Sequence, residues 1–363
     1  MLKVEKTSFS FGSLSVFPNT ILSPMAGVTD PPFRRLCRDL AKNRMGLLVS
    51  EFVSTDGSSD FSLKNRKELK FYPEERPFGI QIFGRDPVRM AKAAGLIETL
   101  QPDFIEINAG CPVPKVADKG GGAGLLRDLD RLAAILRAVK SEIDLPMTLK
   151  CRIGWDEEHI NIFDTLRIAE GEGVDLLTVH GRTRVQGYNG FADWDIIGET
   201  ASRAKIPVVG NGDIVSVNTA REKLEKYPIV GVSIGRGALH NPWLFGQIAD
   251  AWEGNPSLEI SLKEAFSIFE KYYGYMLEDG ITASGALGRL KQLAARLCKG
   301  LFPENLIFRQ SLLTSETPIA FFEKIALFIE DDCSLNTQFY PDRLVNLNGK
   351  KENEVTFGRQ FKG

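Results

Sequence analysis

One cysteine stands where an apolar stretch ends and a turn begins, in Glu106-Ile107-Asn108-Ala109-Gly110-Cys111-Pro112. Gly110 allows the backbone to turn sharply, and Pro112 stiffens the chain after the thiol. A thiol in such a place could act as a nucleophile or as a general acid. Hydrolysis through a nucleophilic thiol would need an adjacent histidine base and an oxyanion hole, and the sequence offers no clear pair for Cys111. Beside an organic redox cofactor, the natural role of this thiol is to donate a proton opposite the hydride.

The alternative for Cys111 is an inert, buried thiol, because free cysteines in proteins commonly behave as small apolar residues. That interpretation suits the other four cysteines better, namely Cys37, Cys151, Cys298 and Cys333. The five form no Cys-x-x-Cys pair and are odd in number, which fits reduced thiols in a cytoplasmic protein. A zinc or iron–sulfur site would need clustered ligands that the sequence does not supply, so we expect no metal.

Two glycine-rich turns follow apolar runs later in the chain, in Gly210-Asn211-Gly212-Asp213 and in Ile234-Gly235-Arg236-Gly237. Glycine lets backbone N–H groups approach an anion, and Arg236 adds a cation that can bind phosphate through two hydrogen bonds. Either turn alone would be explained as an ordinary tight turn, because glycine is common in loops. Two such turns at matching places favour a phosphate-binding site.

Polar residues also interrupt apolar runs. Lys150 lies inside Met147–Arg152, where its charge could stabilise an electron-rich ring, although a lysine extending to the mouth of the fold is a plausible alternative. Gln81 interrupts a similar run and could bond a planar heterocycle. His180 ends a third run next to two arginines, and a functional role there is about as plausible as a structural one.

The elements that must carry these residues alternate along the chain. Eight apolar runs read as strands and are separated by helical patterns such as 30–41, 86–100, 125–143 and 217–227. The strand runs are 20–25, 46–53, 78–83, 103–108, 147–152, 175–180, 206–210 and 230–234. This pattern predicts an α/β fold, a (β/α)8 TIM barrel. An open doubly wound sheet would alternate too, but polar or glycine clusters after nearly every strand favour the barrel.

A small all-α region is predicted after the barrel, with helices at 261–277, 285–299 and 318–329. We expect a catalytic barrel domain over residues 1–252, a helical domain over 253–332 and an irregular tail over 333–363. Arg289, Arg296 and Lys299 share one helix stripe, and between residues 285 and 310 five basic residues stand against one acidic residue. A stripe of this kind suits an RNA phosphate backbone, although a solvated charged face is the ordinary explanation.

The bulk composition constrains function only loosely. A net charge of −2 and a pI near 6.1 argue weakly against nucleic-acid binding, but such affinity depends on local patches rather than on the mean. The N-terminus has no apolar signal core and no long apolar run follows. We therefore expect a cytoplasmic protein, a monomer without a membrane span.

Taken together, the motifs resemble the tRNA-dihydrouridine synthase family of FMN-dependent bacterial enzymes. The resemblance runs from Ile21 to Phe245 and includes Ser23–Arg34, Asn108–Pro112, Lys119–Gly124, Leu149–Trp155, His180–Arg184, Ala192–Trp194, Gly210–Asp213 and Gly235–Ala238. It implies an FMN-bearing barrel, a helical tRNA-binding domain and NADPH or NADH as the reductant. The Arg-x-x-Lys-His-like stretch of the family's helical domain is absent, since Arg289-Leu290-Lys291-Gln292 holds no histidine.

The resemblance also implies roles for individual residues. FMN would be held by Pro24, Met25, Ala26, Gln81, Lys150, His180, Asn211, Gly212, Asp213, Gly235 and Arg236. Uracil would contact Asn108 and Arg152, and Cys111 would protonate C5 while flavin N5 delivers hydride to C6 of a flipped-out uridine.

Two alternatives stay open at this point: an FMN barrel that reduces a free pyrimidine, and an RNA chaperone that has lost turnover. The sequence does not say which uridine is reduced, whether other RNAs are substrates, or whether NADPH is preferred to NADH.

Overall fold

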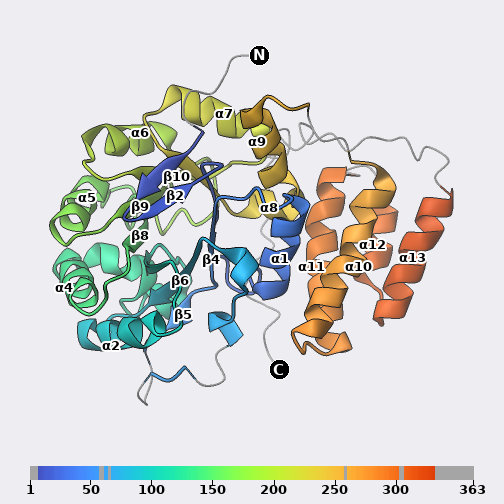
Figure 1. Cartoon of the computed structure of the whole chain (residues 1–363), viewed down its shortest axis with the longest axis horizontal. Coiled ribbons are helices and arrows are strands. Elements are labelled where there is room, and N and C mark those ends of the chain that lie inside the picture. Colours follow the sequence, from blue (N-terminus) through green and yellow to red (C-terminus); the bar gives the residue numbers. More distant parts are fainter. Residues whose placement is uncertain (1–6, 57–60, 64–66, 257–259, 302–305, 332–363) are drawn as a thin grey trace.

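Parallel strands close into a barrel in the computed structural model, which describes residues 7–56, 61–63, 67–256, 260–301 and 306–331 (Figure 1). The barrel strands are β3 (Thr20–Leu22), β4 (Leu47–Val49), β6 (Phe78–Phe83), β7 (Phe104–Ala109), β8 (Met147–Arg152), β9 (Leu176–His180), β10 (Val208–Asn211) and β11 (Gly231–Ile234). Each pairs with its neighbours in parallel, and the pairing of β4 with β6 completes the ring. The predicted barrel is confirmed. The run at 46–53 was predicted as one strand, but it holds β4 and, after a break, the start of β5 (Val53–Ser54).

Helices cover the outside of the barrel (Figure 1). They are α1 (Pro31–Leu40), α2 (Pro87–Glu98), α4 (Leu129–Lys140), α5 (Ile162–Gly171), α6 (Trp194–Arg203), α7 (Val217–Lys226), α8 (Arg236–His240) and α9 (Leu244–Glu253). An aspartate caps the N-terminus of α1, α2, α4 and α6 by accepting a backbone N–H three residues on. The helix predicted over 125–143 is wrong at its start, because the Asp128 cap separates α4 from the 3₁₀ segment η3 (Gly122–Arg127).

The N-terminal end of the barrel is closed by a hairpin that the sequence reading missed. Strands β1 (Phe9–Phe11) and β2 (Leu14–Val16) pair antiparallel. Their buried side chains Phe9, Phe11 and Val16 pack against barrel residues Ile21, Leu47, Val49, Phe104, Leu176 and Val209. This layer at the N-terminal end of the barrel is apolar. The polar residues of the barrel interior therefore lie nearer the carboxyl ends of the strands.

Four more helices pack to one side of the barrel (Figure 1). They are α10 (Leu262–Glu278), α11 (Ala283–Leu301), α12 (Leu306–Leu313) and α13 (Pro318–Asp331). Helices α10, α11 and α13 confirm the predicted ones, whereas α12 was not predicted. Helix α10 contacts α1, and α11 contacts α8. The domain boundaries stay a prediction, and the predicted tail at 333–363 lies outside the described residues. In the part of the chain that the structure describes, no helix is both long and apolar enough to span a membrane.

Candidate active site

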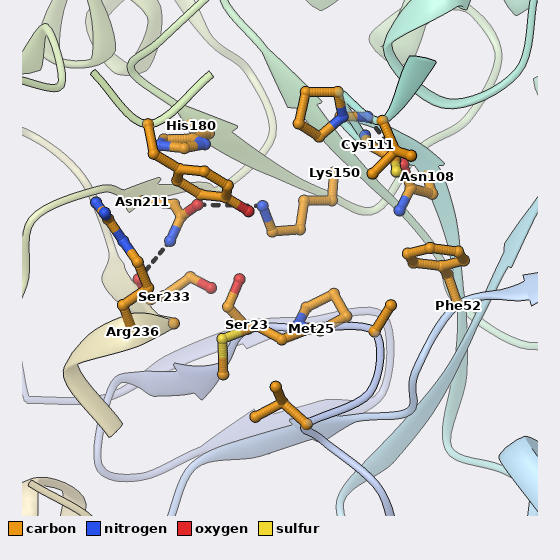
Figure 2. A pocket seen from close by; sticks show the side chains of 18 of the residues that line it. Ser23, Met25, Phe52, Asn108, Cys111, Lys150, His180, Asn211, Ser233 and Arg236 are labelled. Atoms are coloured by element: carbon orange, nitrogen blue, oxygen red, sulfur yellow. Dashed lines mark hydrogen bonds between the residues drawn. The ribbon is translucent and has the colours of Figure 1, made fainter. Parts of the chain in front are cut away.

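A cavity of about 990 Å³ opens at the carboxyl ends of the strands. This is the end of a (β/α)8 barrel that carries the active site. Most of the residues predicted to bind cofactor or substrate line it, namely Pro24, Met25, Ala26, Asn108, Cys111, Lys150, Arg152, His180, Asn211, Gly212, Asp213, Gly235, Arg236 and Arg296. Gln81, Arg289 and Lys299 do not. In Figure 2, Cys111 and Asn108 lie at one end of the cavity, Ser233 and Arg236 at the other, and Lys150 between them.

The loop that carries Cys111 is held by the side chain of Asn108. Asn108 Oδ1 accepts hydrogen bonds from the backbone N–H groups of Gly110 (3.0 Å) and Cys111 (2.9 Å). Burial raises the pKa of the Cys111 thiol, and Arg152, Lys115 and Lys150 offset part of that rise. The thiol therefore keeps its proton at neutral pH, which suits a general acid better than a thiolate nucleophile.

The other described cysteines do not line the cavity. Cys37, Cys151 and Cys298 are buried in the packing around the barrel and the C-terminal helices. Burial raises the pKa of Cys151 and of Cys298 to about 12, so both are inert thiols near neutral pH. Cys333 lies outside the described residues. The sequence-based distinction between Cys111 and these three thiols is in keeping with their positions.

Lys150 extends from β8 toward the centre of the cavity, where its Nζ donates a hydrogen bond to Asn211 Oδ1 (3.1 Å; Figure 2). Asn211 is oriented in turn by donating from Nδ2 to the carbonyl of Ser233 (2.7 Å). Burial lowers the pKa of Lys150 to about 8, and the charge of Glu106 limits the fall. Most Lys150 side chains therefore carry a charge near pH 7, and one of the three ammonium hydrogens is used within the protein.

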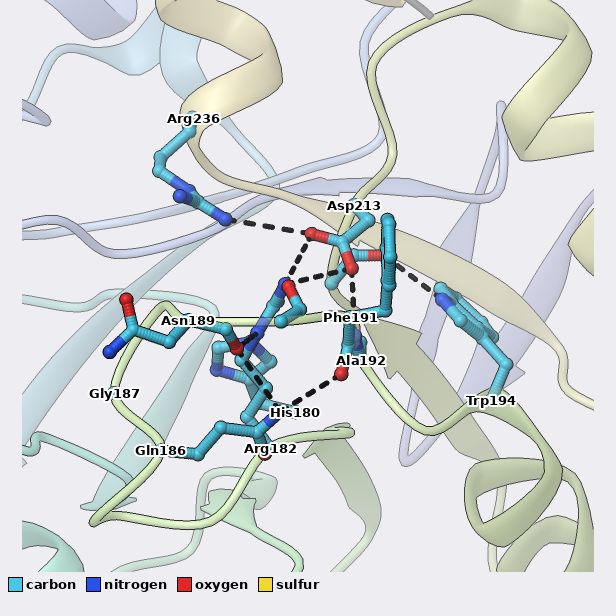
Figure 3. A network of polar contacts seen from close by, with 12 residues as sticks. His180, Arg182, Gln186, Gly187, Asn189, Phe191, Ala192, Trp194, Asp213 and Arg236 are labelled. Atoms are coloured by element: carbon cyan, nitrogen blue, oxygen red, sulfur yellow. Dashed lines mark hydrogen bonds and ion pairs between the residues drawn. The ribbon is translucent and has the colours of Figure 1, made fainter. Parts of the chain in front are cut away.

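A polar network holds the loop after β9 (Figure 3). Arg182 is buried and donates to both oxygens of Asp213, at 2.8 and 2.9 Å, and to the carbonyls of Asn189 and Gly190. Arg182 Nη1 also lies 3.3 Å from His180 Nε2. Burial and the surrounding cations lower the pKa of His180 well below its usual value. His180 is therefore neutral, and since arginine only donates, its Nε2 is the acceptor and its proton sits on Nδ1.

The two predicted phosphate turns meet at one end of the cavity. Gly212 has φ of +131°, and a Cβ there would lie 2.5 Å from the Cβ of Ala192, so only glycine fits. Arg236 lies 3.5 Å from Asp213 and its guanidinium stands over the ring of Tyr188. The Asp213 carboxylate is engaged by Arg182 and Arg236, so any bond from Asp213 to a phosphate would have to come from its backbone.

Arg152 ties the Cys111 loop to the loop after β9. Its Nε donates to the carbonyl of Gly110 (2.8 Å), and its Nη1 donates to the carbonyls of Thr183 (2.8 Å) and Gly187 (2.9 Å). The side chain is 1% exposed yet borders the cavity. This buried cation therefore lies close to Cys111 and faces the space where a substrate would sit.

Gln81 lies inside the barrel below the cavity rather than at its surface. Its Nε2 donates to Glu106 Oε1 (2.7 Å), and its Oε1 accepts from Asn108 Nδ2 (2.8 Å). Both ends of the amide are thus used within the protein. Gln81 does not line the cavity, and its bond to a flavin ring stays a prediction.

The C-terminal helices form one wall of the cavity. Gln292 and Arg296 of α11 line it together with His240 of α8, whose Nδ1 contacts the Arg296 carbonyl at 3.1 Å. Arg289 instead forms an ion pair with Asp30, the cap of α1, and so joins the helices to the barrel. Lys299 is half-buried and does not border the cavity. The predicted basic stripe is therefore divided between a contact with the barrel and the cavity wall.

The sequence reading missed several residues that the structure brings into or near the site. Tyr188, Phe52 and Ser233 line the cavity, and Glu106 lies beneath it. The signal for Glu106 was present, since a carboxylate inside an apolar strand is as unusual as Lys150. Ser233 also faces inward from a strand, directly beside Asn211 in the register of β10 and β11. Tyr188 sits on an irregular loop, and no periodicity could have placed it.

Comparisons with known proteins identify the family of this chain. The family described as Dihydrouridine synthase (Dus) matches residues 21–330. The chain is 38% identical over 266 residues to a "Probable tRNA-dihydrouridine synthase" of Rhodobacter capsulatus, covering 72% of this chain and 80% of that protein. It is 44% identical over 237 residues to "tRNA-dihydrouridine synthase B" of Pseudomonas putida, covering 65% and 69%. A Rickettsia conorii relative, also called "Probable tRNA-dihydrouridine synthase", is 35% identical over 319 residues, covering 87% and 95%.

Solved structures support the fold. Histamine dehydrogenase from Rhizobium sp. 4-9 superposes with a TM-score of 0.54 at 12% identity, covering 76% of this chain and 51% of that one. At that identity the likeness concerns the barrel architecture alone. The family match spans most of the chain and includes the segments that carry Cys111, Lys150 and both glycine turns. The chain belongs to the dihydrouridine synthase family of flavin-dependent oxidoreductases.

Proposed function

We propose that this protein reduces specific uridines of tRNA to 5,6-dihydrouridine, with FMN as cofactor, NADPH or NADH as reductant and Cys111 as proton donor. The observation that carries the proposal is a protonated, buried thiol at the edge of a large cavity that also holds a lysine and two glycine turns. Family membership and the names of the relatives supply the substrate class.

The cavity residues fit a flavin phosphate ester. Ser233 Oγ is buried without a hydrogen-bond partner among the described residues, beside the turn that carries Arg236. Asn211, Gly212, Gly235 and Arg236 would hold the phosphate, Pro24, Met25 and Ala26 would pack on the ring, and His180 would lie beside it. Lys150 would place its charge near the ring atoms that become electron-rich on reduction. When bound and reduced by NADPH, FMN supplies the hydride that uridine C6 accepts.

The uridine would enter the cavity from the RNA surface after leaving its stack, because its C5–C6 bond is unreachable in folded RNA. Asn108 Nδ2 has a second hydrogen besides the one given to Gln81, and it can donate that hydrogen to a uracil carbonyl. Arg152 faces the same space. Tyr188 is half exposed at the cavity wall and offers a ring on which a base can stack.

Cys111 would complete the reduction by giving its proton to C5 as the hydride reaches C6. The thiolate that forms would be stabilised by Arg152, Lys115 and Lys150, the cations that already offset part of the rise in the thiol pKa. It then regains a proton from solvent. A free thiol needs a reducing environment, which agrees with a cytoplasmic enzyme.

On the helical side, we propose that Arg296, with Arg289 and Lys299 nearby, contributes to tRNA binding. Arg296 is the strongest of the three candidates because it borders the cavity. Arg289 already pairs with Asp30, so its contribution would be to hold α11 against α1.

Purified protein loaded with FMN and NADPH, incubated with tRNA that lacks dihydrouridine, tests this function. We expect dihydrouridine in the digested tRNA by mass spectrometry and no product from free uracil. Product from uracil alone would instead indicate a reductase of free pyrimidines. A flavin that NADPH reduces but tRNA never re-oxidises would indicate an RNA-binding protein without turnover.

A further inference from the structure

A chain of hydrogen bonds runs from the interior of the barrel to the backbone at Cys111. Glu106 Oε1 accepts from Gln81 Nε2 (2.7 Å), and Gln81 Oε1 accepts from Asn108 Nδ2 (2.8 Å). Asn108 Oδ1 then accepts from the backbone N–H groups of Gly110 and Cys111. The three side chains are 2%, 0% and 6% exposed. They come from adjacent strands, β6 and β7, with Gln81 and Glu106 directly paired in the register.

The direction of this chain matters because a side-chain amide is nearly the same shape when its oxygen and nitrogen are exchanged. If Asn108 were rotated end for end, its NH₂ group would face the N–H groups of Gly110 and Cys111, and both backbone bonds would be lost. Burial raises the pKa of Glu106 to about 7, so at pH 8 most Glu106 carboxylates are ionised and only accept hydrogen bonds. Glu106 therefore fixes the Gln81 amide with its NH₂ group toward Glu106 and its oxygen toward Asn108. The Gln81 oxygen in turn fixes Asn108 with its NH₂ group toward Gln81 and its oxygen toward the Cys111 loop.

We propose that Glu106 is a positioning residue for Cys111: its carboxylate fixes the orientation of the Gln81 and Asn108 amides and thereby holds the loop that carries the thiol. Glu106 also meets Thr148 Oγ1, 3.5 Å from its Oε2, and the charge of Lys150 acts on the same carboxylate. Neither contact sets the orientation of the Gln81 amide. The structural part of this proposal is independent of the reaction. Its effect on turnover rests on the proposed uridine reduction.

The variants that test the proposal change the direction of the hydrogen bonds while keeping volume. Glu106→Gln removes the group that can only accept. Gln81→Glu combined with Glu106→Gln moves the carboxylate one link toward Asn108, where it still accepts from Asn108 Nδ2 and from the new amide at position 106. Thr178→Val is the matched control, because Thr178 Oγ1 lies in the barrel interior, is buried and has no hydrogen-bond partner among the described residues.

The readout is hydrogen–deuterium exchange of the Gly110 and Cys111 backbone amides at pH 8 in the flavin-free protein, resolved by peptide mass spectrometry. We expect exchange at least fivefold faster in Glu106→Gln, and within twofold of wild type in the exchanged double variant and in Thr178→Val. If Glu106→Gln does not fold, Gln81→Leu with Glu106→Leu replaces it: this variant removes the Gln81–Glu106 hydrogen bond together with both its partners, and Asn108 Nδ2 then lacks the oxygen that orients it. That double variant should also exchange at least fivefold faster.

Unchanged exchange in Glu106→Gln, or faster exchange that the double variant fails to reverse, would overturn the positioning role whether or not the protein reduces uridine. The turnover number with tRNA is then compared in the same variants. We expect it to fall about tenfold in Glu106→Gln and to recover in the double variant, with the rate of flavin reduction by NADPH unchanged. Faster exchange with full turnover would overturn the link to the reaction.

Discussion

The two walls of the cavity are built differently. One wall, which we call the strand-end wall, consists of the residues at the carboxyl ends of the barrel strands. There, hydrogen bonds to other barrel residues hold Cys111, Lys150 and Asn211. On the helical wall, Gln292 and Arg296 are half-buried side chains on the surface of α11. The barrel thus offers preorganised groups suited to chemistry, and the helices add a long cation and an amide to the same cavity. Under the proposed function, we therefore expect turnover to depend on the first wall and RNA affinity on the second.

Removal of the Cys111 thiol should have the largest effect and tests the role of the strand-end wall in turnover. We expect Cys111→Ala to lower the rate of uridine reduction by at least about 100-fold, the range for loss of a positioned acid. Reduction of the flavin by NADPH should be unchanged, because the strand-end residues that would hold the flavin remain. Stopped-flow flavin absorbance measures both half-reactions. A rate of flavin re-oxidation by tRNA within threefold of wild type would remove Cys111 from the mechanism.

A second test of the strand-end wall concerns Lys150 and the affinity for flavin. Lys150→Met should weaken flavin binding by about tenfold, roughly the contribution of one charged hydrogen bond. Because the pKa of Lys150 is lowered to about 8, its charge is present below that pH and is lost above it. Flavin affinity of the wild type should therefore fall between pH 7 and 9, and that of Lys150→Met should not. Quenching of flavin fluorescence measures the affinity, and parallel pH profiles would contradict this role.

Arg296 tests the helical wall. We expect Arg296→Ala to weaken tRNA binding by about 3- to 10-fold and to reduce the slope of log affinity against log salt by about one, as for one lost phosphate contact. Flavin binding should not change. Arg289→Ala is measured beside Arg296→Ala for comparison, because Arg289 pairs with Asp30 inside the protein and does not line the cavity. Equal salt slopes in wild type and Arg296→Ala, measured by filter binding, would assign Arg296 a structural role.

The smallest expected effect concerns stability. Burial raises the pKa of Glu106 to about 7 from a usual 4.5, so the folded state holds a proton that the unfolded state releases between those values. Stability of the wild type should therefore fall as pH rises from about 4.5 to 7. Glu106→Gln has no carboxyl to titrate at this position, so this part of the pH dependence should be absent from its melting temperature measured from about pH 4.5 to 8. An equal slope in the variant would show that other groups cause the pH dependence.

The barrel and much of its site could be predicted from the sequence because the signals were local. Lys150 and Cys111 sit in or directly after apolar runs that can only be buried strands. The hairpin at Phe9–Val16 escaped because its strands are three residues long and show no periodicity. The partner of Arg289 could not be predicted either, since Asp30 meets it only through the packing of α10 and α11 near α1. The hydrogen bonds of Gln81 to Glu106 and Asn108 could not be predicted, because they depend on the register of β6 and β7.

The stereochemistry of reduction tests the central claim most directly. With reduced enzyme and tRNA in D₂O, both new hydrogens on the uracil ring carry deuterium, and coupling between the remaining protons at C5 and C6 reports their relative faces. If Cys111 protonates C5 from the side away from the hydride donor, the two deuterons lie on opposite faces of the ring. Addition to the same face would contradict the assignment of Cys111 as the proton donor.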